Sequence, residues 1–349
     1  MSLHPAQNSA AAAGSASPPR RPAPALRAPA GPASPRPALG WRLKFLLLAV
    51  LWGTSFMWIG IAGEYLPPIQ ITLGRMLTGL IPLAGFVLLR GGRLPRGARM
   101  WFHLSVTAFI INVVPFTLFG YAGQLIPSAV NGICNAATPL FVLLFSLLLL
   151  PDERPTRTRL AGLVIGFVGV LVVFGVWTGL EGAGAAGMLL AVGATVGYGI
   201  GTPYLRRFVA GSGHSSLELV TAQLLTGSVQ ISVAALLFTD VPQALPAQAL
   251  AAVAILGALG TGLAFVLQYG VIREAGATVA STVTYVAPVV AIGAGVVLLG
   301  EDLAWNEPIG ALIIITGAAL AQYQRRTAAA RPQAAEPAHG APPAAAPER

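Results

Sequence analysis

Arg75 is the only charged residue well inside one of the long apolar segments of this sequence. It stands about six residues, or ~9 Å at 1.5 Å per residue, from the nearer end of a predicted helix. Burying a charge at that membrane depth costs roughly 2.5–3.5 kcal/mol, so the side chain must face a partner or a cavity. A guanidinium there can pair with an anionic group such as a carboxylate. The alternative is a structural role, in which helix-end carbonyls or Glu64 hold the guanidinium.

Polar and aromatic residues at similar depth are further candidates for lining a ligand-binding cavity. Asn131 and Asn135 stand four residues apart on one predicted helix and therefore share a face. A later segment has Ala280 and Thr284 at the equivalent positions, so the two polar linings differ. Three aromatic candidates combine an apolar ring with one hydrogen-bonding tip: Trp52, Tyr198 and Tyr285. The alternative for all of these side chains is packing and hydrogen bonding between helices.

Two prolines are candidates for hinges. Pro139 and Pro288 end the similar runs Asn-Ala-Ala-Thr-Pro and Thr-Tyr-Val-Ala-Pro, which lie 149 residues apart. A proline inside a membrane helix removes a backbone donor, and neighbouring groups can compensate for it. We expect a bend at both positions.

The residues needed for metal or acid–base chemistry are missing from the apolar segments. The four histidines are scattered, Cys134 is the only cysteine, and no Asp, Glu or His is expected near the membrane midplane. The sequence therefore predicts no metal site, no cofactor and no enzyme, because no intramembrane catalytic pair can be assembled. No Walker-type phosphate loop is present either, which argues against direct use of ATP.

Composition places these residues in a membrane protein. Hydrophobic residues make up 55% and charged residues 9% of the 349 residues, against about 25% charged in soluble domains. The net charge of +9 does not indicate nucleic acid, since the basic residues are spread over connections and tails. A β-barrel is excluded because its strands would alternate apolar and polar residues. The expected partners are a lipid bilayer and a small molecule.

Apolar stretches of about 20 residues, the length that crosses a bilayer, recur ten times. We predict ten membrane-spanning helices at residues 45–63, 69–89, 101–121, 128–150, 160–177, 185–205, 217–238, 250–270, 278–299 and 308–323.

The basic residues between these segments alternate in a way that predicts orientation. The N-terminal region carries six Lys or Arg, and the even-numbered connections and the C-terminal tail carry all the others except Arg75. The odd-numbered connections have none, although they hold acids such as Glu64, Asp240 and Glu301. Because cytoplasmic connections are enriched in Lys and Arg, both termini are predicted to be cytoplasmic. Residues 1–41 and 324–349 are rich in Ala and Pro and are predicted to be disordered tails.

An internal repeat divides the chain into two five-helix units, 42–178 and 184–323. Arg75-Met-Leu-Thr-Gly matches Gln223-Leu-Leu-Thr-Gly, and Gly162 and Gly169 match Gly310 and Gly317, all at an offset of 148. Asp152-Glu153 matches Glu301-Asp302, yet only the first pair is followed by arginines. Since five is odd, the second unit must enter the membrane from the opposite side. The fold expected is therefore all-α, with ten transmembrane helices in two inverted five-helix repeats, as in many secondary transporters.

The sequence also resembles a known family, the EamA-type domains of the drug/metabolite transporter superfamily. In the second unit the resemblance rests on Ala-Gly-Ala-Thr-Val-Ala-Ser (275–281), Ala-Pro-Val-Val (287–290), Leu-Leu-Gly-Glu-Asp-Leu (298–303), Gly310 and Ile-Thr-Gly-Ala (315–318). In the first unit it rests on Trp-Gly-Thr-Ser (52–55), Arg75, Pro139 and Leu-Pro-Asp-Glu (150–153). Pro151 departs from the family pattern, which has Gly there.

The resemblance implies an exporter or facilitator of amino acids, metabolites or drugs, working by alternating access between the two repeats. Proton-coupled carriers commonly use intramembrane carboxylates, so a facilitator or gradient-driven exporter is favoured over a proton-coupled pump. The alternative function is a membrane-embedded enzyme or a receptor without transport activity. We expect a bacterial inner membrane location, with a plastid membrane as the second choice.

One row of small residues raises the question of self-association. Gly193, Gly197 and Gly201 repeat every four residues and permit close approach of another helix. Packing inside one chain is the simpler interpretation, and a homodimer is the alternative.

Overall fold

Every regular element in the described part of the chain is a helix. The structure is a computed structural model, and it describes residues 40–151, 153, 155–178, 182–242 and 245–329. The helices are α1 Trp41–Gly53, α2 Ser55–Gly63, α3 Pro68–Leu89, α4 Ala98–Ala108, η1 Phe109–Val113, α5 Val114–Ala122, α6 Ser128–Asn135, α7 Thr138–Leu149, α8 Arg157–Phe174, η2 Val176–Thr178, α9 Gly182–Phe208, α10 Ser216–Phe238, α11 Ala247–Ala254, η3 Ile255–Leu263, α12 Ala264–Ala275, α13 Ala277–Ser281, α14 Val283–Leu299 and α15 Asn306–Ala329.

Within those described residues, nine continuous helical stretches are long and apolar enough to cross a membrane. They correspond to the first nine predicted spans, with ends that differ by a few residues. The tenth predicted span, 308–323, falls in α15, whose side chains are described only as far as Gln322. Because α15 continues to Ala329, residues 324–329 are helical, which corrects the start of the predicted C-terminal tail. Residues 1–39 and 330–349 lie outside the described part.

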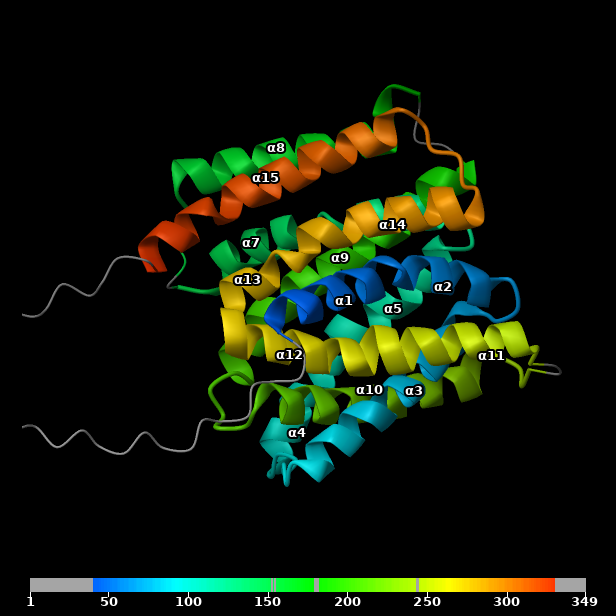
Figure 1. Ribbon diagram of the computed structural model, residues 1–349, viewed down its shortest axis with the longest axis vertical. Helices are drawn as coiled ribbons and strands as arrows, with labels where there is room; N and C mark the ends of the chain where they lie inside the picture. The colour runs from blue at the N-terminus through cyan, green and yellow to red at the C-terminus, as the bar shows by residue number, and fades with distance from the viewer. Residues whose placement is uncertain (1–39, 152, 154, 179–181, 243–244, 330–349) are drawn as a thin grey trace, which may run out of the picture. The chain divides into compact units, whose positions relative to one another are not determined.

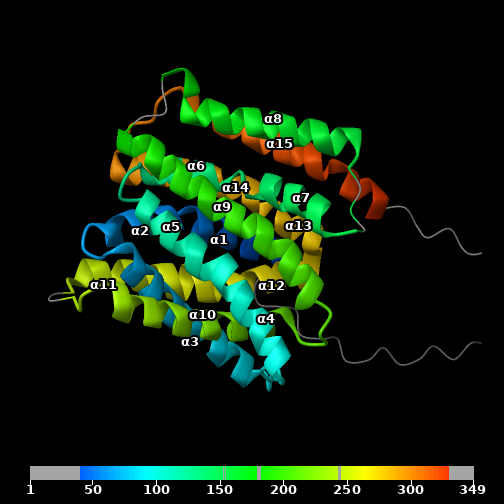
Figure 2. The same cartoon turned by 180° about the vertical axis from the view of Figure 1, so that it is seen from behind.

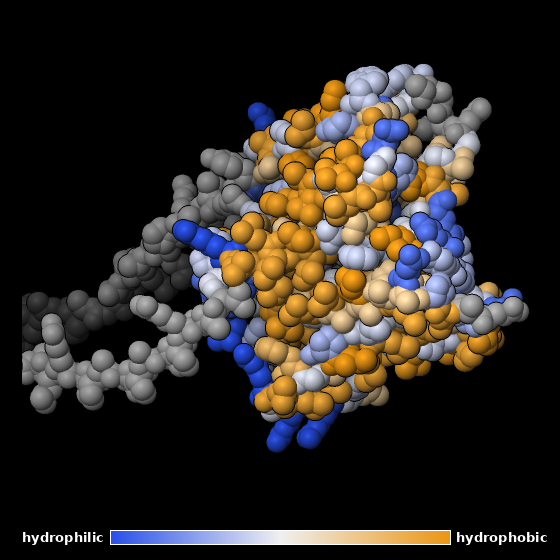
Figure 3. Space-filling view, turned by 45° about the vertical axis from the view of Figure 1, so that its right-hand side comes forward, coloured by the Kyte–Doolittle hydropathy of each residue, from blue (hydrophilic) through white to orange (hydrophobic). Residues whose placement is uncertain are grey.

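The surface of the helices is apolar, as lipid contact requires. Large apolar side chains point outward along the spans, for example Ile81 at 71%, Leu88 at 73% and Leu236 at 82% exposed. Figure 3 shows hydrophobic side chains over the middle of the visible face, with hydrophilic residues mainly toward its two ends. Only a third to a half of the most apolar window of each span is buried within the protein. The remaining apolar area is of the kind that a bilayer covers.

Three spans are interrupted, the first and the fourth near their middle and the ninth near its start. The first is divided at Thr54, between α1 and α2, and the fourth at residues 136–137, between α6 and α7. The ninth is divided at Thr282, between α13 and α14. Pro139 directly follows the second of these breaks, whereas Pro288 lies inside α14, six residues after the third. The interruptions therefore do not fall at equivalent places relative to the two prolines.

Two other spans, the third and the eighth, each contain a π-helical turn, η1 and η3. In the third span Pro115 follows η1, and its ring cannot fit against the carbonyl four residues earlier in a regular helix. A wider turn removes that clash. Such turns are rare and are frequently found at functional sites.

The ends of the helices divide the connections between two sides of the bundle. Figure 1 shows the start of α1, the end of α15 and the ends of α7, α9 and α12 on one side. Arginines lie at these ends: Arg206 and Arg207 are in the last turn of α9, Arg273 is in the last turn of α12, and Arg157 begins α8 after α7. We call this the Arg-rich side. The opposite side, where α2 ends and α11 begins, is called the Arg-free side.

The longest helix–helix contact joins α8 and α15, which run side by side along one edge (Figures 1 and 2). Glycines bring their backbones together. A Cβ added at Gly162 would lie 2.6 Å from the carbonyl oxygen of Gly317, and one at Gly169 would lie 2.9 Å from that of Gly310. Small residues of this kind allow close packing in membranes, where van der Waals contact replaces the hydrophobic effect between helices.

The row Gly193, Gly197 and Gly201 also packs inside the chain. A Cβ at Gly197 would lie 2.9 Å from the Ile110 carbonyl oxygen, and Gly201 faces Ile111. These contacts are with the third span of the same chain. These contacts agree with the simpler interpretation of the glycine row, packing inside one chain.

We predict that Gly317→Ala lowers the free energy of unfolding by about 1–3 kcal/mol, because the added methyl meets the backbone of Gly166, which cannot move aside. Gly293→Ala is the matched control, since nothing lies within 4 Å of its added Cβ. Thermal unfolding of both variants in detergent measures the difference. Equal effects of the two substitutions would contradict this packing.

Candidate solute-binding cluster between the two repeats

Arg75 lies about seven residues from the start of α3, on the half of the membrane nearest the Arg-free side. The residue is only 8% exposed. Its Nε donates a hydrogen bond to the Thr261 hydroxyl at 2.9 Å, and its guanidinium carbon lies 3.7 Å from the centre of the Phe116 ring. Thr261 and Phe116 belong to the eighth and third spans. In the described part of the chain Arg75 forms no ion pair, either with Glu64 or with another acid.

A second buried polar pair lies between the seventh and third spans. The Gln223 amide donates a hydrogen bond to the Asn112 side-chain oxygen at 2.5 Å. Gln223 is 4% and Asn112 1% exposed. Gln223 stands about seven residues from the start of α10, on the half nearest the Arg-rich side.

Each residue of one pair has its repeat equivalent in the other pair. Gln223 follows Arg75 by 148 residues, and Thr261 follows Asn112 by 149. In each case a donor on the second helix of one unit bonds an acceptor on the third helix of the other unit. The two pairs are therefore related by the same offset as the two repeats, with Arg75 toward the Arg-free side of the bundle and Gln223 toward the Arg-rich side.

Both acceptors stand in the π-helical turns. Asn112 belongs to η1 and Thr261 to η3. The Thr261 hydroxyl also donates to the Leu256 carbonyl, five residues earlier, at 3.2 Å, which is the spacing that a π-turn provides. The widened turns thus position the two acceptors toward the donors of the opposite unit.

The two pairs are connected through Phe116, one helical turn after Asn112 on the third span. Its ring carries the guanidinium of Arg75 on its face. We name Arg75, Asn112, Phe116, Gln223 and Thr261 the inter-repeat polar cluster. One end carries a positive charge with five potential donors, and the other end carries two neutral amides. Chemically, such a site can bind an anionic group at the first end and an uncharged polar group at the second.

Of the residues predicted from sequence, Tyr198 lies beside this cluster. It packs against the same buried group as Phe116, and its ring centre lies 6.1 Å from that of Phe119. Asn131 is fully buried and donates to the Phe119 carbonyl at 3.0 Å, while its side-chain oxygen has no partner. Trp52 makes an edge-to-face contact with Phe265, centre to centre 6.5 Å.

The remaining predicted residues are engaged elsewhere. Asn135 accepts a hydrogen bond from Thr138 at 3.2 Å, and Thr284 donates to the Ser281 carbonyl at 2.8 Å. The Tyr285 hydroxyl donates to the Ala318 carbonyl of α15 at 3.2 Å. These contacts are local or structural, and their part in ligand binding stays a prediction.

Sequence reasoning did not select Asn112, Phe116, Gln223 or Thr261. The repeat offset applied to Arg75 points to Gln223, so that residue was accessible from the sequence. Nothing comparable marks Asn112 or Thr261, because a π-turn changes which side chains share a face and leaves no clear periodic signal.

The repeated acidic motif joins helix ends on both sides. On the Arg-free side, Glu301 accepts from the backbone N–H groups of Ser128 and Ala129, at 2.7 and 2.9 Å, at the start of α6. On the Arg-rich side, Glu153 pairs with Arg159 at 2.9 Å and Arg206 at 2.7 Å. Among the described residues, no group of three His, Cys, Asp or Glu is placed to hold a metal ion.

A pocket of about 460 Å³ lies at the Arg-free end beside Glu301. Glu64, Gln124 and Ser128 contribute to its lining. It opens between the ends of the first, third and ninth spans. The pocket therefore lies at the same end of the bundle as the start of α3, the helix that carries Arg75.

Comparison with known proteins identifies the fold and its family. The model of the EamA-like transporter family matches residues 39–175 and, a second time, residues 185–323. The chain belongs to the EamA-like transporter family. The predicted resemblance is thereby confirmed, and the protein is a multi-pass inner membrane transporter with two EamA domains.

Relatives of this EamA protein carry transporter names. It is 27% identical over 287 residues to the uncharacterized inner membrane transporter YedA of Escherichia coli (strain K12), covering 82% of this chain and 91% of that protein. It is 23% identical over 290 residues to a probable amino-acid metabolite efflux pump of Salmonella typhimurium (strain LT2), covering 78% and 91%. A chain solved by crystallography has a similar fold, with a TM-score of 0.59, 24% identity, and coverage of 82% and 98%.

A double-mutant cycle tests the neutral pair of the cluster. We expect Asn112→Ala and Gln223→Ala to show a coupling of about 0.6 kcal/mol, and at most about 1.7, as is typical of hydrogen bonds between membrane helices. Unfolding of the single and double variants measures it. The control cycle pairs Asn112→Ala with Gln230→Ala, because Gln230 bonds Ser105 instead. Coupling in the control as large as in the test pair would refute the assignment.

Proposed function

We propose that this protein is a secondary transporter that moves a small organic solute by alternating access, with the inter-repeat polar cluster at the centre of the path. The observation that carries the proposal is that the hydrogen-bonded pairs Arg75–Thr261 and Gln223–Asn112 occupy equivalent positions in the two repeats, with the repeats interchanged. Two units that contact each other in equivalent ways can exchange conformations, so that one opening closes as the other forms.

The proposal includes ten spans in two inverted repeats. The contacts of α8 with α15 support it, because Gly162–Gly317 and Gly169–Gly310 are the same contact with the repeats interchanged. The 24 residues of α15 are long enough to form the tenth span. With ten spans, the start of α1 and the end of α15 fall on one side, as their placement in Figure 1 suggests.

We further propose that the Arg-rich side faces the cytoplasm, so that both termini are cytoplasmic. The positive-inside rule supports this orientation. The Glu301 side, without arginines in its connections, then faces outward. The efflux name of the Salmonella relative favours export as the direction of transport.

For the solute, the cluster favours an anionic or zwitterionic compound. Arg75 meets one hydrogen-bond acceptor in the described residues, Thr261, so most of its donors are available to a ligand carboxylate. We propose that Tyr198 and Asn131 also line the path of the solute. Asn135, Trp52, Thr284 and Tyr285 would contact the solute only after the path opens. Pro139 and Pro288 are the proposed hinges. Pro139 follows the break in the fourth span, and Pro288 lies inside α14 of the ninth span.

Reconstituted vesicles test this function. We expect the protein to move anionic or zwitterionic organic solutes faster than empty liposomes do. Arg75→Gln should reduce this flux by about 10- to 100-fold, since a hydrogen bond to a charged group contributes roughly 1.5–3 kcal/mol. Adding Gln223→Arg to that variant should restore part of the flux, because the mirrored position then carries the guanidinium.

Arg90→Gln is the matched control, because Arg90 is an exposed arginine stacked on Phe86 outside the cluster. It should transport like the unaltered protein. Normal flux of an anionic solute by a folded Arg75→Gln variant would refute the proposed part of Arg75. Absence of flux across a broad solute panel would refute transport itself and favour the receptor alternative.

A further inference from the structure

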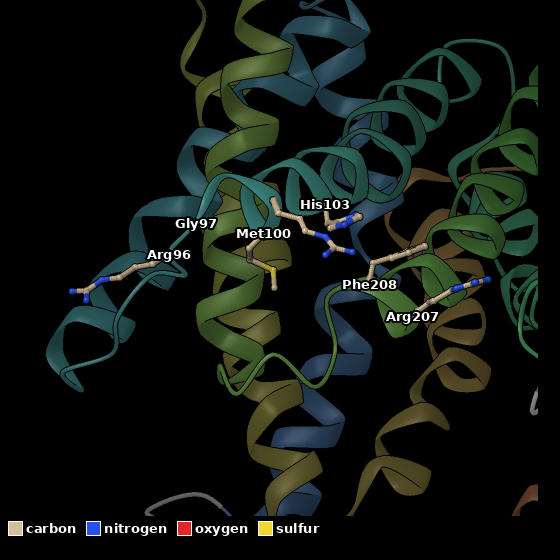
Figure 4. A pocket seen from close by; sticks show the side chains of 7 residues that line it. Arg96, Gly97, Met100, His103, Arg207 and Phe208 are labelled. Carbon is tan, nitrogen blue, oxygen red and sulfur yellow. The ribbon is translucent and has the colours of Figure 1, made fainter.

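A second pocket, of about 370 Å³, lies at the Arg-rich end between the start of α4 and the end of α9. Its lining includes Arg96, Arg99 and Arg207, together with His103 and Phe208. Figure 4 shows His103 and Phe208 next to each other, with Arg96 and Arg207 extending outward on opposite sides. The pocket is remote from Arg75 along the helices and is not used by the transport mechanism.

The charge around this pocket is uncompensated. No carboxylate lines it. Within the described residues, none of its three arginines belongs to an ion pair, whereas the neighbouring Arg206 is paired with Glu153 at 2.7 Å. Arg207 donates a long hydrogen bond of 3.4 Å to the Leu149 carbonyl, and its guanidinium carbon lies 5.4 Å from the centre of the Phe208 ring. All three are exposed, so their side chains can turn toward an anion held between them.

The aromatic side chains that line the pocket contact one another. The His103 ring stacks on Phe208, with centres 4.9 Å apart and planes 8° apart. One ring nitrogen, Nδ1, shares a hydrogen bond with the Tyr204 hydroxyl at 2.8 Å. Nε2 is therefore available to the pocket as a further polar group. The chain turns into α4 at Gly97, which caps the helix without a side-chain hydrogen bond.

The position of the pocket points to a lipid as the source of the anion. It lies in the first turns of α4 and the last turn of α9, both parts of membrane spans. Apolar side chains close to its lining residues in sequence are exposed, Phe102 at 62% and Leu94 at 38%, and the Phe102 ring contacts that of His103. This combination of basic groups at headgroup depth and apolar groups beside them is suited to an anionic phospholipid.

The equivalent connection in the second repeat lacks this chemistry. Residues 239–246, between α10 and α11, contain Asp240 and no Lys or Arg. This equivalent connection therefore lacks the basic side chains that line the pocket. The pocket lies on the Arg-rich side.

We propose that this pocket is a binding site for the phosphate headgroup of an anionic phospholipid in the leaflet on the Arg-rich side. The phosphate lies among Arg96, Arg99 and Arg207, with His103 beneath it, and the acyl chains run along Phe102 and Leu94. Binding of the lipid is separate from the transported solute, so this proposal stands or fails independently of the transport function.

The test uses the purified full-length protein in neutral detergent, titrated with phosphatidylglycerol, phosphatidylcholine or inorganic phosphate. Native mass spectrometry counts bound lipid, and thermal unfolding reports the stabilisation. We expect phosphatidylglycerol to bind and stabilise the protein more strongly than phosphatidylcholine. The variant Arg96→Gln/Arg99→Gln/Arg207→Gln should bind phosphatidylglycerol at least about tenfold more weakly, equivalent to 1.4 kcal/mol.

The matched control, Arg42→Gln/Arg90→Gln/Arg273→Gln, removes the same charge from the same side without touching the pocket. Its affinity should stay within about twofold of the unaltered protein. Equal loss in both triple variants would overturn the site, because only net charge would then matter. Equal stabilisation by inorganic phosphate would overturn the lipid assignment. The single variant Arg99→Glu, which should also lose binding, provides a second test if the triple variant folds poorly.

Discussion

The hydrocarbon of the bilayer offers no hydrogen-bond partner to a polar group, and this constraint organises the whole protein. It explains why every described regular element is a helix and why buried polar side chains such as Thr107, Thr221 and Gln223 bond a carbonyl of their own helix or a side chain of another helix. Arg75 and Gln223 each reach an acceptor in the opposite unit, at Thr261 and Asn112. The same bonds that satisfy these groups also connect the two repeats. In the proposed mechanism, the solute competes for these bonds in the polar interior between the units.

The difference between the two halves of the cluster is as informative as their equivalence. A symmetric pair would treat both sides of the membrane alike, but Arg75 places a charge only on the half nearest the Arg-free side. The acidic motif differs in the same manner, since Glu153 is neutralised by Arg159 and Arg206 while Glu301 holds the start of α6. In the proposed mechanism, the duplicated scaffold supplies the motion, and the unequal side chains supply direction and selectivity.

Much of this arrangement was accessible from the sequence. Apolar length and arginine alternation predicted the spans, and the offset of 148 residues predicted that Gly162 and Gly169 correspond to Gly310 and Gly317. The burial of Arg75 followed from its position. The partners of Arg75 and Gln223 did not, because the offset changes by one residue between them and the π-turns rotate Asn112 and Thr261 out of regular helical register. The contact of Glu301 with α6, 173 residues away in sequence, likewise depends on tertiary packing.

Alternating access through the inter-repeat polar cluster requires that its two ends be reached from opposite sides of the membrane. After replacement of the buried Cys134 by alanine, Thr261→Cys and Asn112→Cys can be exposed separately to a membrane-impermeant thiol reagent in oriented vesicles. The account predicts that Thr261→Cys reacts from the Arg-free side and Asn112→Cys from the Arg-rich side, and that a transported solute slows both reactions. Reaction of both positions from one side only, or of neither while solute is moving, would contradict it.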